Sequence, residues 1–273
     1  MSHPTTIRQL SGKYNGFTYR DSGEGFPVVL LHGFPMDGSL WNAQVAALQQ
    51  ELRLLVPDLP GSGASPLLSP LDMETMADMV HAMLMQEGIT SCILIGHSMG
   101  GYVSLAFAEK YPDLLKGWGL FHSTALPDSD EKKESRLKSV ALMETYGSAA
   151  FLRQMMPGMF GEAFRKTHPE ALKELIKERS GMPVESLAAY YHAMRKRPDR
   201  RAVLEHSAVP VLFILGKEDN AAPLADVLPQ VALPQISVIH IFDHIAHMGM
   251  LELSAKTSVK ILKDFIGFCL QKS

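Results

Sequence analysis

The sequence has little cysteine and only a small net charge. Cys92 and Cys269 are the two cysteines among 273 residues, too few for the disulfide framework of a small secreted domain. Cys92 falls in a predicted strand and Cys269 in the predicted last helix, so we expect buried thiols rather than metal ligands. The formal net charge of -3 offers no basic excess, which phosphate backbones require. We therefore expect no nucleic-acid partner.

Long apolar runs are also absent. No uninterrupted stretch approaches the roughly 20 residues that span a bilayer. The segment Met1–Arg8 lacks the apolar core of a secretory leader. We therefore expect a cytoplasmic protein without a membrane partner. Internal repeats at solenoid periods and low-complexity tracts are missing as well.

Apolar residues make up 46% of the chain, which is typical of a globular protein with one large α/β core. Apolar runs of strand length alternate with segments of helical periodicity, a pattern that predicts a parallel, doubly wound sheet. The predicted strands cover residues 27–32, 52–57, 91–96, 115–122, 210–216 and 235–241, and predicted helices cover 39–50, 73–87 and 102–110. Asn15-Gly16, within residues 13–20, predicts a hairpin that opens the sheet in the antiparallel sense.

The segment 124–204 differs in character from the chain on either side. It contains four predicted helices, at 136–146, 149–156, 169–180 and 184–194, and no convincing strand. We expect a helical cap inserted into a core domain formed by residues 1–123 and 205–273. The insertion is rich in methionine and aromatic residues, among them Met155, Met159 and Tyr190. Part of this set could line a pocket for an acyl or ring group; the alternative is simple packing of helix on helix.

Residues Cys92–Gly101 combine an apolar run with the pattern Gly-x-Ser-x-Gly around Ser98. A serine at the tip of a tight strand-to-helix turn requires small neighbours, which Gly96 and Gly100 provide. The unpaired amides at the start of the helix stabilise negative charge on an attacked carbonyl oxygen. The alternative is a glycine-rich turn that merely caps a helix. The strand before Ser98 and the helix after it favour a nucleophile.

A serine nucleophile requires a base, and the end of the chain offers candidates. Asp219 follows the strand predicted at 210–216, and His247 follows the last predicted strand. The order Ser98, Asp219, His247 is the order expected when the partners follow successive late strands. We predict that His247 accepts the Ser98 proton and that Asp219 stays ionised and orients the imidazole; Glu218 should point elsewhere. His244 is the alternative base.

The first predicted parallel strand ends in His32-Gly33. A chain that leaves a buried strand through such a pair can turn its next amide toward the carboxyl end of the sheet, where α/β proteins place their sites. The backbone amides of Phe34 and Met99 are therefore the predicted oxyanion donors. The alternative is that His32 and Gly33 form only a strand exit.

With these motifs, the chain resembles the α/β-hydrolase superfamily, in particular its cap-bearing small esterases and enol-lactone hydrolases. Five motifs carry the resemblance: His32-Gly33-Phe34-Pro35, Asp58–Gly63, Gly96–Gly101, Gly216–Asp219 and Ala246–Met248. The resemblance implies a mostly parallel eight-stranded sheet flanked by helices, with Ser98, Asp219 and His247 as catalytic residues, Phe34 and Met99 as oxyanion amides, and no cofactor. The family usually has glycine where Ala246 stands, which keeps His244 open as the base.

Seven residues are expected to border the substrate pocket: His32, Met36, His97, Met155, Met159, Tyr190 and Met248. A metal site formed by His240, His244 and His247 is disfavoured, because their spacing would need a helix. The predicted function is hydrolysis of a small carboxylic ester or lactone through an acyl-serine intermediate. Carbon–carbon bond hydrolysis, thioester hydrolysis and perhydrolysis on the same fold remain alternatives, as does a non-catalytic ligand-binding protein.

Overall fold

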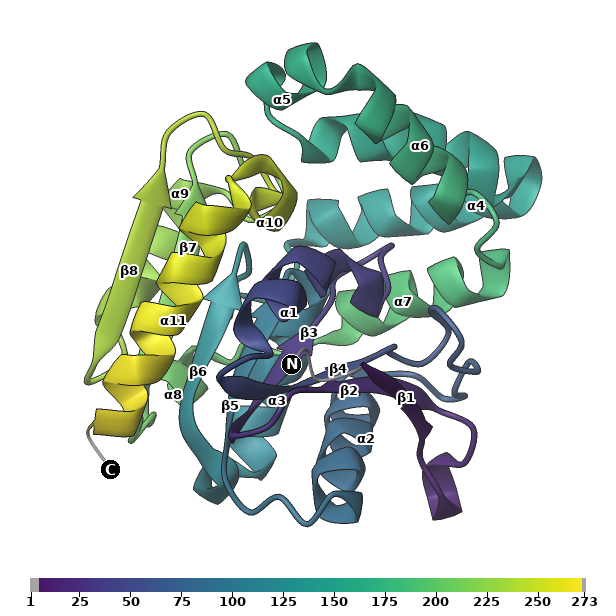
Figure 1. Ribbon diagram of the computed structural model, residues 1–273. Coiled ribbons are helices and arrows are strands. Elements are labelled where there is room, and N and C mark those ends of the chain that lie inside the picture. The colour runs from purple at the N-terminus through teal and green to yellow at the C-terminus, as the bar shows by residue number, and fades with distance from the viewer. Residues whose placement is uncertain (1–4, 272–273) are drawn as a thin grey trace.

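One sheet of eight strands organises the protein (Figure 1). The computed structural model describes residues 5–271, so residues 1–4 and 272–273 of the predicted core domain lie outside the described part. The strands are β1 (Thr6–Gln9), β2 (Thr18–Ser22), β3 (Phe26–Leu31), β4 (Leu52–Pro57), β5 (Cys92–His97), β6 (Leu115–Phe121), β7 (Val211–Gly216) and β8 (Ser237–Phe242). Their order is β1-β2-β4-β3-β5-β6-β7-β8. The pairs β1/β2 and β2/β4 are antiparallel and the other five pairs are parallel, which confirms the predicted fold class.

Helices cover both faces of the sheet, and adjacent residues of β6 show this directly. Gly117 packs against Cys269 of α11 (Ala255–Gln271), so closely that a Cβ atom on Gly117 would lie 2.4 Å from the sulfur. Trp118 points to the opposite face, where its indole N–H donates to Ser207 after α8 (Arg201–Glu205). Because both faces are covered, β5 and β7 are buried along their whole length. Both cysteines are buried, as expected.

The remaining helices of the sheet domain follow the predicted periodicity. They are α1 (Asn42–Leu48), α2 (Met73–Gln86), α3 (Met99–Lys110), α9 (Leu224–Val227) and α10 (Gly249–Glu252). In α2 the side chain of Asp72 accepts a hydrogen bond from the Thr75 amide and the Thr75 side chain accepts one from the Asp72 amide, a reciprocal cap that defines the start of the helix. Helices α1 and α11 pack together, as do α2 and α3.

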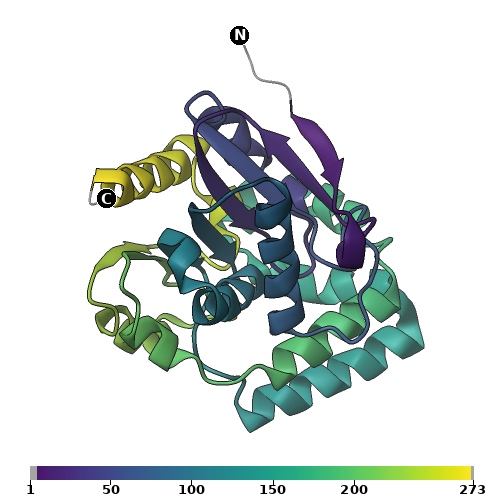
Figure 2. The same ribbon diagram turned by 90° about the horizontal axis from the view of Figure 1, so that it is seen from below.

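The chain between β6 and β7 is helical, as predicted. It forms α4 (Asp130–Met155), α5 (Glu162–Thr167), α6 (Pro169–Arg179), α7 (Val184–Lys196) and α8. We call residues 124–204 the insertion. In Figure 1, α4, α5 and α6 lie beyond the ends to which the arrows of β6 and β8 point. The insertion therefore covers the carboxyl ends of the strands. Figure 2 gives the view from below. Gly147 interrupts α4 with φ +78°, at the gap between the two helices predicted there.

The predicted hairpin at residues 13–20 is wrong in its first strand. The strand that precedes β2 and pairs with it is β1, which ends at Gln9, five residues before Tyr14. Residues Gly12–Tyr14 form a 3-10 turn instead. Tyr14 is buried there and packs edge to face on Phe17, with ring centroids 5.9 Å apart. Burial of this ring outweighs the local strand preference. Within residues 5–271 no helix combines the length and apolarity that crossing a bilayer demands.

Candidate active site

Ser98 lies at the turn between β5 and α3, in a backbone conformation with φ +51° and ψ -116°. This left-handed conformation is strained for a residue with a side chain. The glycines on either side are sterically required. A Cβ atom on Gly96 would lie 2.2 Å from the carbonyl oxygen of Gly100, and one on Gly100 would lie 2.6 Å from that of His32. The turn therefore presents Ser98 at the carboxyl end of the sheet, against the start of a helix.

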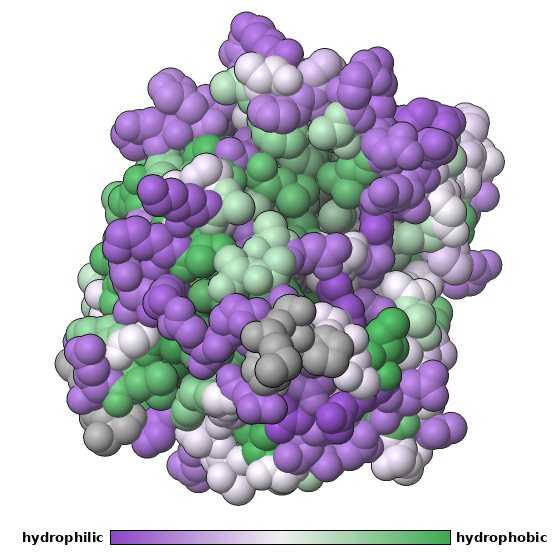
Figure 3. All heavy atoms as spheres, in the orientation of Figure 1, coloured by the Kyte–Doolittle hydropathy of each residue, from purple (hydrophilic) through white to green (hydrophobic). Residues whose placement is uncertain are grey.

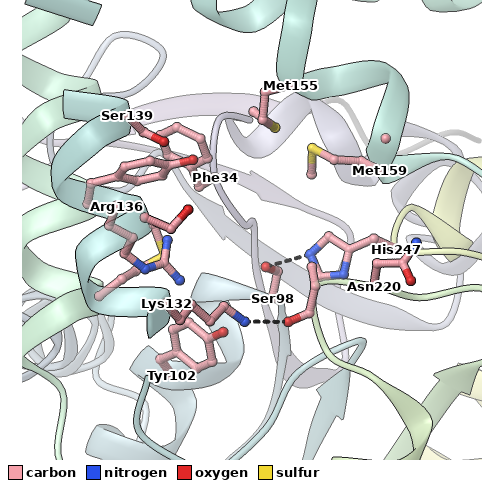
Figure 4. Close-up of a pocket in the computed structure, with 15 residues that line it drawn as sticks. Phe34, Ser98, Tyr102, Lys132, Arg136, Ser139, Met155, Met159, Asn220 and His247 are labelled. Atoms are coloured by element: carbon pink, nitrogen blue, oxygen red, sulfur yellow. Dashed lines mark hydrogen bonds between the residues drawn. The ribbon is translucent and has the colours of Figure 1, made fainter. Parts of the chain in front are cut away.

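Ser98, His247 and Asp219 form a continuous hydrogen-bonded chain. The Ser98 Oγ lies 2.7 Å from Nε2 of His247, the contact that is dashed in Figure 4. The other ring nitrogen, Nδ1, lies 3.0 Å from both carboxylate oxygens of Asp219. All three residues are less than a tenth exposed. A carboxylate only accepts, so Nδ1 carries a proton and Nε2 is the acceptor for the Ser98 hydroxyl.

Asp219 is surrounded by donors. The amides of Ala221 and Ala222 donate to Oδ1 at 2.8 and 3.0 Å, and Nδ1 of His122 lies 3.1 Å from Oδ2. Burial by itself raises the pKa of a carboxyl group, but the charge of His247 and the hydrogen bonds from His122 and His247 hold the pKa of Asp219 well below its usual range. Asp219 is thus kept as an anion that can stabilise an imidazolium.

The contact of His122 with Asp219 was not anticipated from the sequence. His122 follows β6 and is fully buried, with φ +51°. The available signal was a polar residue at the carboxyl end of a buried strand. That signal points to Asp219 only once the sheet order is known. Strand β6 lies between β5, which leads to Ser98, and β7, which leads to Asp219.

The loop after β3 lies directly against the turn that holds Ser98. A Cβ atom on Gly33 would lie 2.8 Å from the Ser98 Cβ and 3.0 Å from the carbonyl oxygen of His97. Phe34 follows Gly33 directly in the chain, and Met99 is the first residue of α3, where amides have no partner within the helix. The positions suit the two predicted oxyanion donors.

The insertion contacts the loop that carries His247. The His247 amide donates to the carbonyl oxygen of Met159 at 3.0 Å. Glu252 in α10 accepts hydrogen bonds from the amide of Gly161, at 2.8 Å, and from the amides of Ala246 and Met248, at 3.3 and 3.0 Å. One carboxylate therefore joins the residues on both sides of His247 to the insertion.

A cavity of about 310 Å³ opens beside Ser98 and His247. The sheet domain and the insertion both contribute to its wall, and Met155 and Met159 line it as the sequence predicted (Figure 4). The other lining residues are Phe34, Tyr102, Lys132, Ser135, Arg136, Ser139, Gly158, Tyr191, Met194, Asn220 and Ala221. On the face of Figure 3, apolar side chains gather in a hollow between the helices at the top of the view and the domain below.

Five residues predicted to border this cavity do not line it: His32, Met36, His97, Tyr190 and Met248. All five are buried. Nε2 of His32 accepts the Leu59 amide at 2.9 Å, and Nε2 of His97 donates to the carbonyl oxygen of His247 at 2.9 Å. These histidines hold loops around the site, and burial lowers the pKa of each.

Tyr190 shows why such positions are hard to assign from sequence. Its hydroxyl donates to the carbonyl oxygen of Leu59 at 3.2 Å, under the cavity wall. Its neighbour Tyr191 lines the cavity instead. Successive residues on a helix point about 100° apart, so a one-residue error moves a side chain from the cavity to the core.

The alternative base, His244, lies away from Ser98. Its side chain is 83% exposed and Nδ1 lies 3.4 Å from Oε1 of Glu218. Glu218 also accepts the Glu162 amide at 3.1 Å, so it points away from His247, as predicted. The part of the chain that the structure describes contains no group of three or more His, Cys, Asp or Glu side chains placed to hold a metal ion. The three histidines of the disfavoured metal alternative do not converge.

Comparison with known proteins agrees with the resemblance expected from the motifs. A model of the alpha/beta hydrolase fold matches residues 27–167, which is 141 of the 273 residues. A pimeloyl-[acyl-carrier protein] methyl ester esterase from Methylococcus capsulatus is 28% identical and covers 92% of this chain and 99% of its own. A putative carbamate hydrolase from Pantoea ananatis is 35% identical over 72% of both chains.

Solved structures give the same result for the fold. A thermophilic esterase from Thermogutta terrifontis, solved with malate bound, superposes with a TM-score of 0.89 at 29% identity, covering 97% of this chain and 99% of its own. An enol-lactonase from Burkholderia xenovorans superposes with a TM-score of 0.85 at 24% identity, covering 96% of this chain and all of its own. At that identity the second match bears on the fold alone.

Proposed function

Because the chain belongs to the α/β hydrolase fold family, we propose that it hydrolyses a small carboxylic ester or lactone through an acyl-Ser98 intermediate. One observation carries the proposal: Oγ of Ser98 lies 2.7 Å from a histidine nitrogen whose ring is oriented by a buried carboxylate. Two of the relatives named above are esterases, and a third is a putative carbamate hydrolase. The assembled chain of Ser98, His247 and Asp219 favours catalysis over a binding protein that has kept only the fold.

The first half of the reaction forms the acyl-enzyme. Nε2 of His247 accepts the hydroxyl proton as Oγ of Ser98 attacks the carbonyl carbon. The amides of Phe34 and Met99 donate to the oxyanion of the tetrahedral intermediate. His247 then gives its proton to the leaving alkoxide, and the carbon–oxygen bond breaks. Asp219 stays ionised throughout and stabilises the imidazolium.

The second half returns the free enzyme. A water molecule enters the cavity and loses a proton to Nε2 of His247 as its oxygen attacks the acyl carbon. The same two amides hold the second oxyanion. Collapse of the intermediate returns the proton to Oγ of Ser98 and releases the carboxylic acid.

In this proposal residues 1–123 and 205–273 form the catalytic core and the insertion, residues 124–204, forms a cap over it. Support comes from the residues that line the cavity, because both parts of the chain contribute some of them. Ser98 and His247 belong to the sheet domain, whereas Met155, Met159 and Tyr191 belong to the insertion. The substrate would therefore bind between the two parts.

The test is covalent labelling of Ser98. Wild type and Ser98→Ala are incubated with a fluorophosphonate, intact mass is measured, and turnover of p-nitrophenyl esters is followed across acyl lengths. We expect one adduct on wild type, none on the variant, and loss of ester turnover in the variant with its thermal unfolding preserved. A folded wild type that forms no adduct, or a variant with comparable turnover, would contradict the proposal.

A further inference from the structure

The charged residues that α4 contributes to the cavity wall are all cations. Lys132, Ser135, Arg136 and Ser139 line the cavity from one side of α4, at the spacing of residues that share a helix face. Within the described chain no Asp or Glu is among the lining residues. Figure 4 shows Arg136 on one side of Ser98 and His247 on the other. We call these four residues the α4 stripe.

The positive charge of the α4 stripe is only partly compensated by the protein. Asp128 is fully buried and accepts hydrogen bonds from both Arg136 and Arg197. Burial opposes its ionisation, yet the hydrogen bond from Arg136 and the charges of both arginines lower the pKa of Asp128. One carboxylate therefore serves two guanidinium groups, and one positive charge remains.

Lys132 adds a second excess charge. Its Nζ donates to the carbonyl oxygen of Ala221 at 2.8 Å, across the cavity from α4. This carbonyl is neutral, and it accepts a hydrogen bond from only one of the three N–H groups of the ammonium. No ion pair joins Lys132 to a carboxylate of residues 5–271. On the α4 side of the cavity, three cations therefore have one carboxylate partner among the described residues, because Asp128 pairs with Arg136 and Arg197 and Lys132 has only a carbonyl oxygen.

Partly buried cations without matching anions are unfavourable unless a ligand supplies the charge. The groups on the α4 stripe suit a carboxylate in particular, because guanidinium, ammonium and hydroxyl groups all donate to it. The apolar side chains of Met155 and Met159 lie in the same cavity and suit a short methylene chain. A volume of about 310 Å³ limits the occupant to a small molecule.

We propose that the α4 stripe binds a second, free carboxylate of the substrate, so that the enzyme acts on small esters or lactones whose acyl part is itself an acid. This inference rests on the proposed ester hydrolysis at Ser98 and names the substrate class of that site. Lys132 and Arg136 are specificity-determining residues in this reading, and the reacting carbonyl lies at the other end of the same molecule.

The test compares two esters that differ only in charge. Monomethyl glutarate carries the free carboxylate, and methyl 5-amino-5-oxopentanoate carries a neutral carboxamide in its place. We expect wild type to hydrolyse the acid with a kcat/KM about tenfold or more above that of the amide, mainly through KM. Lys132→Met should remove most of this ratio, and Lys132→Arg should restore it. Lys138→Met, at an exposed position of the same helix, should leave both rates unchanged.

A binding measurement separates failure of this inference from failure of the proposed function. Calorimetry with Ser98→Ala compares the binding of glutarate with the binding of its neutral diamide, glutaramide, in the absence of turnover. Preferential binding of glutarate, lost in Ser98→Ala/Lys132→Met, supports the carboxylate site even if neither ester is hydrolysed. Equal binding of the two compounds, equal kcat/KM for the two esters, or an equal fall for both in Lys132→Met overturns the inference while leaving ester hydrolysis intact.

Discussion

Replacing Glu252 by glutamine tests how the insertion holds the His247 loop. The Glu252 carboxylate accepts three amides, those of Gly161, Ala246 and Met248. Glutamine has the same shape but one acceptor oxygen. In its best orientation that oxygen keeps the amides of Gly161 and Ala246, and the side-chain NH₂ group faces the N–H of Met248. The variant therefore loses the hydrogen bond from the amide of Met248, the residue directly after His247.

The expected magnitude follows from these contacts. Loss of one hydrogen bond to a charged acceptor costs about 1.5–3 kcal/mol. Burial raises the pKa of Glu252, so removal of the charge relieves part of a desolvation penalty. We expect a net loss of about 1–2 kcal/mol, or about 2–8 °C in Tm for a chain of this size. Because His247 lies between Ala246 and Met248, a shifted imidazole should also lower kcat by roughly tenfold, with KM little changed.

The assay combines thermal unfolding with ester kinetics on wild type, Glu252→Gln and Glu144→Gln. Glu144 is an exposed residue of α4, so its variant controls for loss of a glutamate charge in itself. Fluorophosphonate labelling of Glu252→Gln at long times should still reach one adduct, because Ser98 is intact. If Tm and kcat of Glu252→Gln both equal those of wild type, the carboxylate does not hold the loop and the reasoning is refuted.

Two further predictions concern the base and the acid stability of the fold. His247→Ala should lower kcat by about 10⁴ or more, because Ser98 loses its proton acceptor, whereas His244→Ala should stay close to wild type in the same p-nitrophenyl ester assay; a reversal would assign the base to His244. Asp37 accepts from Ser39 and pairs with Arg179 of the insertion. Although burial opposes it, these partners lower the pKa of Asp37 from 3.8 to about 2. Stabilisation from a lowered pKa is present above the unfolded value and is lost as pH falls toward the folded one. We therefore expect Asp37→Asn to reduce the unfolding free energy in urea by about 1–2 kcal/mol at pH 6, after allowance for solvent screening, and by less at pH 3. A difference that does not change with pH would count against the pairing.

The site residues that could be predicted from sequence are those whose role depends on local geometry. Ser98 was identifiable because the strand, the turn and the helix around it occupy one short stretch, and the need for Gly96 and Gly100 follows from backbone contacts within or beside that turn. Asp219 and His247 were predictable as loop residues after late strands, because parallel strands bring their carboxyl ends to one edge. Their hydrogen bonds to each other and to Ser98 agree with that prediction, and their catalytic roles await the experiments above.

Features that depend on pairing between distant segments were not predictable in the same way. The strand that pairs with β2 was misplaced because burial of Tyr14 decided the turn. His122 joined the Asp219 network only because β6 lies between β5 and β7 in the sheet. Of the seven residues predicted to border the substrate pocket, Met155 and Met159 line the cavity beside Ser98 and the other five do not, since helix rotation and loop packing decide which side chains face a cavity.

The sequence by itself thus determined the turn that presents Ser98, the order of the three candidate catalytic residues and the alternation of strands and helices, because sterics and hydrophobic periodicity act over a few neighbouring residues. The tertiary structure alone decided that Lys132 and Arg136 face the cavity, that Arg136 shares the counter-ion Asp128 with Arg197, and that Glu252 ties the His247 loop to the insertion. Those arrangements join residues that lie far apart along the chain or on different helix faces. Their energies depend on burial and distance, which no local pattern encodes.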